Sequence, residues 1–411
     1  MVIGVISVFF VIKEQRERIY SLNLIHWVFI LTFLSFVPFM QYISGKFPLW
    51  LSREDGFSIC RANLFILTWT VFYQFGYSIK KFRAGKLFSS FKRFEIGKRG
   101  LYISIYLSFI ILIGFLFIFG MKNLLIRGAY REVLISIHYN PIMIIIDKFF
   151  RVIPLLSLVG LILLKDKWEN KRKWWILVIA LILINLFVNN PLASERYWAG
   201  TVILGFIVML LRKLDRGKGW VLAILLIGIF FVFPLSNVLR YKTGDTISLS
   251  DFRLSELRTA YASPDFDAYE MGVHVTEYVE KEGITWGKQL LGSLLFWIPR
   301  SLWRGKPIGS GGMVADYFSY PRVNLSCPLP FEGYINFSVI GLIVFASLIG
   351  ILFSSLDEYH WRESTTKSYN IISAYYPFLL GFGFFAMRGD LMSSFSYTVM
   401  FIAAGMVLIV K

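Results

Sequence analysis

The strongest constraint on this chain is a succession of long apolar segments. A helix needs about 20 mostly apolar residues to cross a bilayer, and reading apolar runs as spans gives about eleven, within roughly ten to twelve. The runs lie near residues 1–12, 20–43, 62–79, 101–120, 149–164, 174–189, 197–211, 220–236, 335–354, 371–387 and 391–410. Only 17% of the 411 residues are charged, below the proportion of soluble domains. We therefore expect an all-α polytopic membrane protein with one membrane domain over residues 1–411.

The segments between these runs alternate in charge. Lysine and arginine cluster after the first, third, fifth, seventh and ninth runs, and the positive-inside rule places such segments in the cytoplasm. The alternation predicts a bacterial inner-membrane protein with a cytoplasmic C-terminus. It also accounts for the net charge of +17 without a nucleic-acid partner. The first run is too short to span securely, so its status stays open.

A long polar segment, residues 237–333, falls on the predicted outer side and is the largest part that must fold in water. Its first part has helical spacing interrupted by Pro264, which predicts two amphipathic helices across the outer mouth. Residues 285–303 are apolar but contain Pro299. A re-entrant or interfacial helix fits them better than a full span.

Cations gather near the end of this outer segment. Arg300, Arg304 and Lys306 lie within seven residues, beside Trp303. Guanidinium forks flanked by aromatic rings at a membrane surface suit a lipid-linked phosphate or pyrophosphate.

Two further arginines occupy short outer turns between apolar runs. Arg196 lies in NNPLASERYW and Arg388 in MRGD. An arginine near hydrocarbon is costly, so such residues often face a polar cavity and mark a function. The alternative is that each side chain reaches the headgroups or pairs with its neighbour, Glu195 or Asp390.

Motifs of soluble enzymes are sparse. The sequence has no GxxxxGK[ST] motif, and IGSGG is interpreted as a flexible loop because no strand precedes it and no helix is expected after it. Asp265 and Asp267 form a DxD pattern, interpreted as a solvated helix face. The scattered histidines exclude an HExxH zinc motif, although His138 could accept a proton. Cys60 and Cys327 are expected to be buried free thiols rather than a disulfide.

Several short motifs occur in order on the predicted outer side. NPLASERYW, IPRSLWRGKP, EGYINFSVIG and MRGDL together resemble the oligosaccharide repeat-unit polymerases, the Wzy-type O-antigen and capsule polymerases. The likeness covers roughly residues 185–395. Glu54 and Asp55, in an early outer loop, add a resemblance to GT-C glycosyltransferases. One departure is Ser338, where the family tends to have glycine.

The resemblance implies a glycosyltransferase that needs neither metal nor cofactor. It would transfer a glycan from undecaprenyl pyrophosphate to a second lipid-linked repeat unit at the periplasmic face of the membrane, making O-antigen or capsular polysaccharide. Donor, acceptor and membrane lipid are then its partners, and a chain-length regulator protein is left open as another. The expected catalytic residues are Glu332 as base, Asp390 as second choice, Arg300 and Arg388. The expected pyrophosphate- and glycan-binding residues are Arg196, Arg304, Lys306, Tyr334, Asn336 and Trp303.

Two alternatives stay open at this point. A flippase or transporter for lipid-linked oligosaccharides would carry charges inside its spans and have two similar halves, whereas these apolar runs contain few charges. An O-antigen ligase would share the donor and differ in the acceptor.

Overall fold

The structure is a computed structural model of the chain. It describes residues 1–49, 51, 55–79, 94–121, 124, 141–191, 193–211, 219–232, 261–321, 324–363 and 370–410.

Within these ranges the chain is helical and contains no strand. Over its described residues, each of the predicted apolar runs lies largely in helix. Five helical segments are long and apolar enough to cross a membrane, which is consistent with a helical membrane protein. They are Leu22–Ser44, Lys98–Phe119, Leu329–Arg362, Ile371–Arg388 and Leu391–Ile409. The number of actual spans and the GT-C architecture remain predictions.

The N-terminal helices form one packed group. They are α1 (Val2–Glu17), α2 (Leu22–Leu31), the π-helical turn η1 (Thr32–Phe36), α3 (Val37–Ser44) and α4 (Gly56–Ser78). Ser21 caps α2 by accepting a hydrogen bond from the Leu24 backbone N–H. The wide π turn lies just before Pro38. Because proline has no N–H to donate to the preceding turn, the helix widens there and continues instead of ending.

The middle of the chain supplies a second group. It comprises α6 (Lys98–Phe119), α9 (Pro141–Leu163), the short 3₁₀ turn η3 (Lys165–Lys167), α10 (Lys171–Val188), α11 (Arg196–Leu211), α12 (Trp220–Ile227) and the π-helical η4 (Gly228–Val232).

The described part of the outer segment contains the 3₁₀ turn η6 (Pro264–Phe266), α15 (Ala268–Glu282), α16 (Lys288–Leu294) and α17 (Ser310–Tyr317). Helix α15 corresponds to the second predicted amphipathic helix, whereas the first falls on residues outside the described ranges. Most of the first nine residues of α15 are fully buried, so it is packed into the protein. The helix predicted over residues 285–303 is only α16, followed by turns.

The C-terminal helices are α18 (Leu329–Glu363), α19 (Ile371–Arg388), α20 (Leu391–Gly405) and the 3₁₀ turn η7 (Met406–Ile409). Helix α18 is interrupted at Phe337 and Ser338, whose backbone angles are not helical. A short N-terminal piece that carries Glu332 is thus set off from the long remainder of α18.

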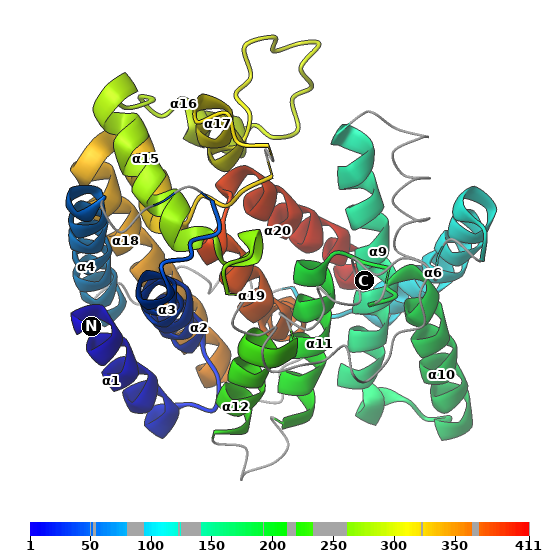
Figure 1. The fold of residues 1–411 in the computed structure, drawn as a ribbon. Helices are drawn as coiled ribbons and strands as arrows, with labels where there is room; N and C mark the ends of the chain where they lie inside the picture. Colours follow the sequence, from blue (N-terminus) through cyan, green and yellow to red (C-terminus); the bar gives the residue numbers. More distant parts are fainter. Residues whose placement is uncertain are drawn as a thin grey trace, which may run out of the picture.

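Two hydrophobic cores hold the helices together. One is built mainly from α1 to α4, α15 and α18, and the other mainly from α6, α9, α10 and the C-terminal helices. Helix α19 contributes Tyr376, Leu380 and Met387 to the first core and Phe378 and Phe382 to the second. It therefore lies along the boundary between the cores (Figure 1).

Helices α15 to α17 gather at one end of the protein, and the basic turn η3 lies at the opposite end (Figure 1). Separation of the basic turn from the outer segment is what the predicted orientation requires.

Candidate functional site

The turn that joins α19 to α20 is the centre of the candidate site. It consists of Arg388, Gly389 and Asp390. Gly389 has φ of +85°, and a side chain there would clash with the backbone carbonyl of Cys327. Glycine is therefore required, since it alone adopts this conformation easily and permits this approach.

Arg388 forms an ion pair with Asp267. Its Nη2 lies 2.9 Å from Asp267 Oδ1 and 3.3 Å from the carbonyl oxygen of Pro264. Asp267 is fully buried and also accepts hydrogen bonds from the Ser326 backbone N–H and hydroxyl, at 3.0 and 2.8 Å. Burial raises the pKa of Asp267, although Arg388 and Ser326 oppose the shift. Arg388 Nε is buried and has no hydrogen-bond partner in the described part of the chain.

Arg196, the first residue of α11, forms a two-pronged ion pair with Asp265. Both side chains remain slightly exposed, at 17% for Arg196 and 19% for Asp265. The interpretation of Asp265 and Asp267 as a solvated helix face is thus wrong. The two aspartates precede α15 and hold arginines from two turns that are distant in sequence.

Two further carboxylates lie at the start of α20, next to the same turn. Glu332 is buried and accepts hydrogen bonds from Ser310 Oγ at 2.7 Å and from the Leu391 backbone N–H at 3.0 Å. Asp390 caps α20 by accepting a hydrogen bond from the Ser393 backbone N–H at 2.9 Å. The two carboxylates are close enough to repel each other electrostatically. Burial raises the pKa of Asp390 against the opposing Ser393 hydrogen bonds.

Helix α17 places Ser310 against Glu332. The helix begins at Ser310, inside the IGSGG motif, so the expectation that no helix follows this motif is wrong. A side chain at Gly309 would clash with the carboxylate of Asp390. The close approach of α17 to this carboxylate therefore depends on glycine at this position.

The cations of residues 300–306 form a separate group. Arg300 donates hydrogen bonds to the carbonyls of Lys306 and Pro307, at 2.7 and 3.1 Å. Lys306 Nζ donates to the carbonyls of Phe296 and Ile298, at 2.6 and 2.8 Å. Burial and the nearby Arg300 lower the pKa of Lys306.

These hydrogen bonds all lie within the loop of residues 296–307. In the same loop, the Arg304 side chain is exposed and Trp303 is half-buried. The structure therefore brings Arg196 and Arg388 to one acidic segment but gives Arg300 and Lys306 backbone partners of their own. Binding of pyrophosphate by Arg300, Arg304 or Lys306 stays a prediction.

Tyr334 and Asn336 are buried close to the break in α18. The Tyr334 ring lies 4.4 Å from that of Phe65, centroid to centroid. Asn336 Oδ1 accepts hydrogen bonds from Leu290 N–H at 3.1 Å and Thr285 Oγ1 at 3.2 Å. Both side chains thus fasten this break to neighbouring segments, and their predicted contact with glycan is untested.

A buried charged cluster on α9 was missed from the sequence. Lys148 lies 2.6 Å from Glu195 and 3.3 Å from Asp147, and Arg151 lies 3.1 Å from Asp147. The cluster is joined along the chain to the Arg196–Asp265 pair, because Glu195 and Arg196 are adjacent. Its signal was the i, i+4 spacing of Asp147 and Arg151 at the edge of an apolar run.

Cys60 and Cys327 are both free thiols, as predicted, although Cys60 is exposed rather than buried. Burial and the nearby Glu332 raise the pKa of Cys327. His138 and Glu54 lie outside the described residues. In the part of the chain that the structure describes, no three His, Cys, Asp or Glu side chains form a group suited to a metal ion.

Comparison with known proteins gave no matching family model, no matching characterised protein and no matching solved structure. The class that the fold defines is thus a helical protein, within the described ranges, with several helices suited to a membrane.

Proposed function

We propose that this protein is a membrane glycosyltransferase that polymerises repeat units carried on undecaprenyl pyrophosphate at the outer face of the bacterial cytoplasmic membrane. The observation that carries the proposal is the approach of Arg196 and Arg388 to one short segment, Asp265–Asp267, near the buried carboxylate of Glu332 and the half-buried carboxylate of Asp390. Two guanidinium groups from separate turns suit a ligand with two adjacent phosphates.

The arginines would stabilise the leaving group. As the bond between the anomeric carbon and pyrophosphate breaks, negative charge grows on the pyrophosphate oxygen. A preorganised donor aimed at that charge is commonly worth about 3 to 4 kcal/mol. The Arg196–Asp265 pair is partly exposed, so an entering phosphate can take the place of the Asp265 carboxylate. Arg388 keeps Nε as a free donor within the described part of the chain.

One of the two carboxylates would accept the proton of the attacking hydroxyl group. The acceptor hydroxyl attacks the anomeric carbon, its proton passes to a carboxylate, and undecaprenyl pyrophosphate leaves. Glu332 is the first choice for this base because hydrogen bonds from Ser310 and Leu391 hold it in one position. Asp390 is the second choice. Burial makes a carboxyl group a stronger proton acceptor, which is useful in a base.

The test is complementation of a strain deleted for the gene. The Arg196→Ala and Arg388→Ala variants should give single repeat units in place of long polymer, with about 100-fold less product. Lys288→Ala, which removes a cation at the start of α16, is the matched control and should support normal chain length. Normal polymer in both arginine variants at normal expression would remove these arginines from the site.

The same strain separates polymerase from ligase and transporter. Loss of a polymerase leaves one repeat unit attached to its final acceptor, whereas loss of a ligase leaves long polymer unattached. Loss of a transporter removes all repeat units from the outer face. Either of the last two outcomes would contradict the proposed reaction.

A further inference from the structure

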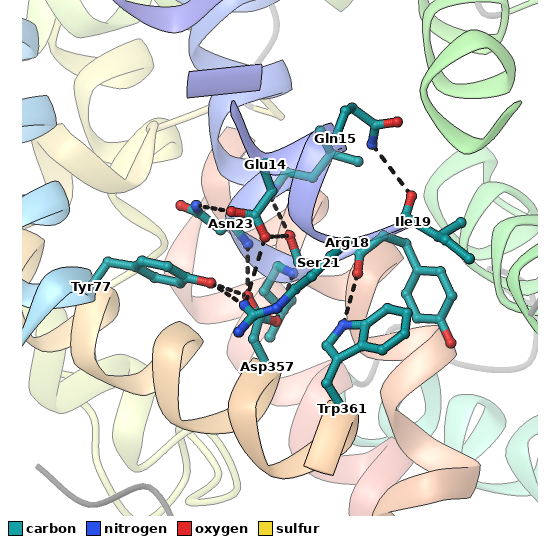
Figure 2. Close-up of polar contacts among 12 residues, drawn as sticks. Glu14, Gln15, Arg18, Ile19, Ser21, Asn23, Tyr77, Asp357 and Trp361 are labelled. Atoms are coloured by element: carbon teal, nitrogen blue, oxygen red, sulfur yellow. Dashed lines mark hydrogen bonds and ion pairs between the residues drawn. The ribbon is translucent and has the colours of Figure 1, made fainter. Parts of the chain in front are cut away.

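A second buried charged cluster lies at the end of the protein opposite α15 to α17. It joins Glu14 on α1, Arg18 just after α1 and Asp357 on α18 (Figure 2). Arg18 Nη1 lies 3.7 Å from Glu14 Oε1 and 3.7 Å from Asp357 Oδ2. The exposed fractions of the side chains are 6% for Glu14, 0% for Asp357 and 21% for Arg18.

Hydrogen bonds fix both carboxylates. Asp357 accepts the backbone N–H groups of Leu22 and Asn23, at 2.8 and 3.2 Å, and therefore lies at the N-terminus of α2. It also accepts the hydroxyls of Tyr77, at 2.9 Å, and Tyr376. Through these contacts the Asp357 carboxylate, on α18, connects α4, α19 and the N-terminus of α2.

Glu14 has its own donors. It accepts Ser21 Oγ at 2.6 Å and Asn23 Nδ2 at 2.7 Å. Tyr77 also accepts a hydrogen bond from Arg18 Nη1 at 2.6 Å. The α1–α2 turn is therefore fastened to α4, α18 and α19 through this cluster (Figure 2).

The charges within the cluster do not balance. Two carboxylates share one guanidinium, which leaves one net negative charge when both are ionised. Burying an uncompensated charge is expensive. One bound proton removes the excess charge.

The surrounding groups permit a proton to bind. The facing titratable groups are Tyr20 and His26 from the α1–α2 turn and α2, Tyr73 and Tyr77 from α4, His360 from α18 and Tyr376 from α19. A tyrosine hydroxyl both donates and accepts. Tyr77 or Tyr376 can therefore turn and accept a hydrogen bond from protonated Asp357, so that no donor is stranded.

From this geometry we propose that the Glu14–Arg18–Asp357 cluster is a proton-binding site that controls how firmly the α1–α2 turn is held on α18. The proton compensates the second carboxylate. Loss of the proton leaves a buried net charge where this turn meets Asp357. The site is separate from the outer carboxylates, and the proposal does not depend on the proposed reaction.

The test measures thermal unfolding of the purified full-length protein in nanodiscs from acidic to alkaline pH. The folded cluster binds the proton more tightly than the unfolded chain, so this cluster lowers the unfolding temperature as pH rises. Glu14→Gln balances the charges and should remove about 2–4 °C or more of that decline. Glu17→Gln changes an exposed residue of the same helix and should keep the wild-type pH dependence. Equal pH dependence in both variants would overturn the proposal.

Tyr376→Phe separates proton binding from a purely structural role. It removes a donor to ionised Asp357, so the proton should bind more tightly and the titration should move to higher pH. A purely structural role predicts the same loss of stability at every pH. If Glu14→Gln fails to fold, infrared spectra of wild type and Tyr376→Phe decide. A protonated carboxyl band whose titration shifts in the variant supports the site, and an unshifted or absent band contradicts it.

Discussion

Ser338 adopts a backbone conformation that suits glycine. Its φ is +58° and ψ is −152°, and such angles cost a residue with a side chain of order 1–3 kcal/mol. The position is the one at which the resemblance to repeat-unit polymerases leads one to expect glycine. The break in α18 gives that expectation a physical reason.

Ser338→Gly should therefore stabilise the protein. We expect a gain of about 1 kcal/mol, because glycine relieves the strain but gains more freedom in the unfolded chain. Thermal unfolding in detergent measures it, with Ser347→Gly, in the regular part of α18, as a control that should be destabilised. A lower unfolding temperature for Ser338→Gly would show that the strain is not relieved.

The two aspartates before α15 should differ in their effect on stability. Asp267 is fully buried and removing it leaves Arg388 without its carboxylate, so Asp267→Ala should cost about 3 kcal/mol or more. The Arg196–Asp265 pair is partly exposed, and Asp265→Ala should cost about 1 kcal/mol or less. Equal losses in chemical unfolding would contradict this difference in environment.

The sequence identifies functionally suggestive single residues better than it identifies the residues with which they pair. Arg196 and Arg388 attract attention because they occupy short turns between apolar runs. Their partners lie in a distant segment, and one sequence carries no local signal of that pairing. Asp265 and Asp267 were misread for the same reason, since a DxD pattern looks alike on a solvated helix and at a buried ion pair.

Helices α4 and α18 approach each other closely at two glycines. A side chain at Gly76 would clash with the backbone carbonyl of Ser347, and one at Gly350 would clash with the carbonyl of Tyr73. The two glycines thus let the helix backbones approach each other, as small residues do in membrane helix pairs.

Gly76→Ala should separate these helices and lower stability, despite the higher helix propensity of alanine. A cost of about 1–3 kcal/mol is expected from overpacking. Gly114→Ala is the matched control on α6, where no atom of the described residues lies within 4 Å of the added carbon, and it should be neutral or stabilising. Similar unfolding temperatures for the two variants would argue against the close helix contact.

The helices themselves were predictable because apolar length and helical spacing are local properties. Details that depend on packing were not. The π turn before Pro38 and the shortness of α16 reflect how the chain meets its neighbours, and the burial of α15 depends on contacts with α4, α17 and α18.

For the whole molecule, the predicted orientation places Cys60 at the outer end of α4. Cys60 is exposed whereas Cys327 is buried. A membrane-impermeant maleimide added outside cells with a permeabilised outer membrane should label wild type but not Cys60→Ser. Cys327→Ser should be labelled like wild type. Labelling of Cys60 only after lysis would reverse the predicted topology.

The sequence could suggest a polytopic membrane protein and an outer polar segment. It could not show the boundary between the two hydrophobic cores, at whose end the candidate site lies. That boundary arises because α19 belongs to both cores and ends at Arg388. The arrangement depends on which helices pack together, which the succession of apolar runs leaves undetermined.

In the proposed function, Arg196 and Arg388 together bind the two phosphates of a polyprenyl carrier. The most direct test is the affinity of the purified protein in nanodiscs for undecaprenyl pyrophosphate, measured for wild type, Arg196→Ala, Arg388→Ala and the Lys288→Ala control. The Kd should be at least about tenfold higher in each arginine variant, equivalent to about 1.4 kcal/mol, and unchanged in the control. Equal affinity in all four proteins would contradict it.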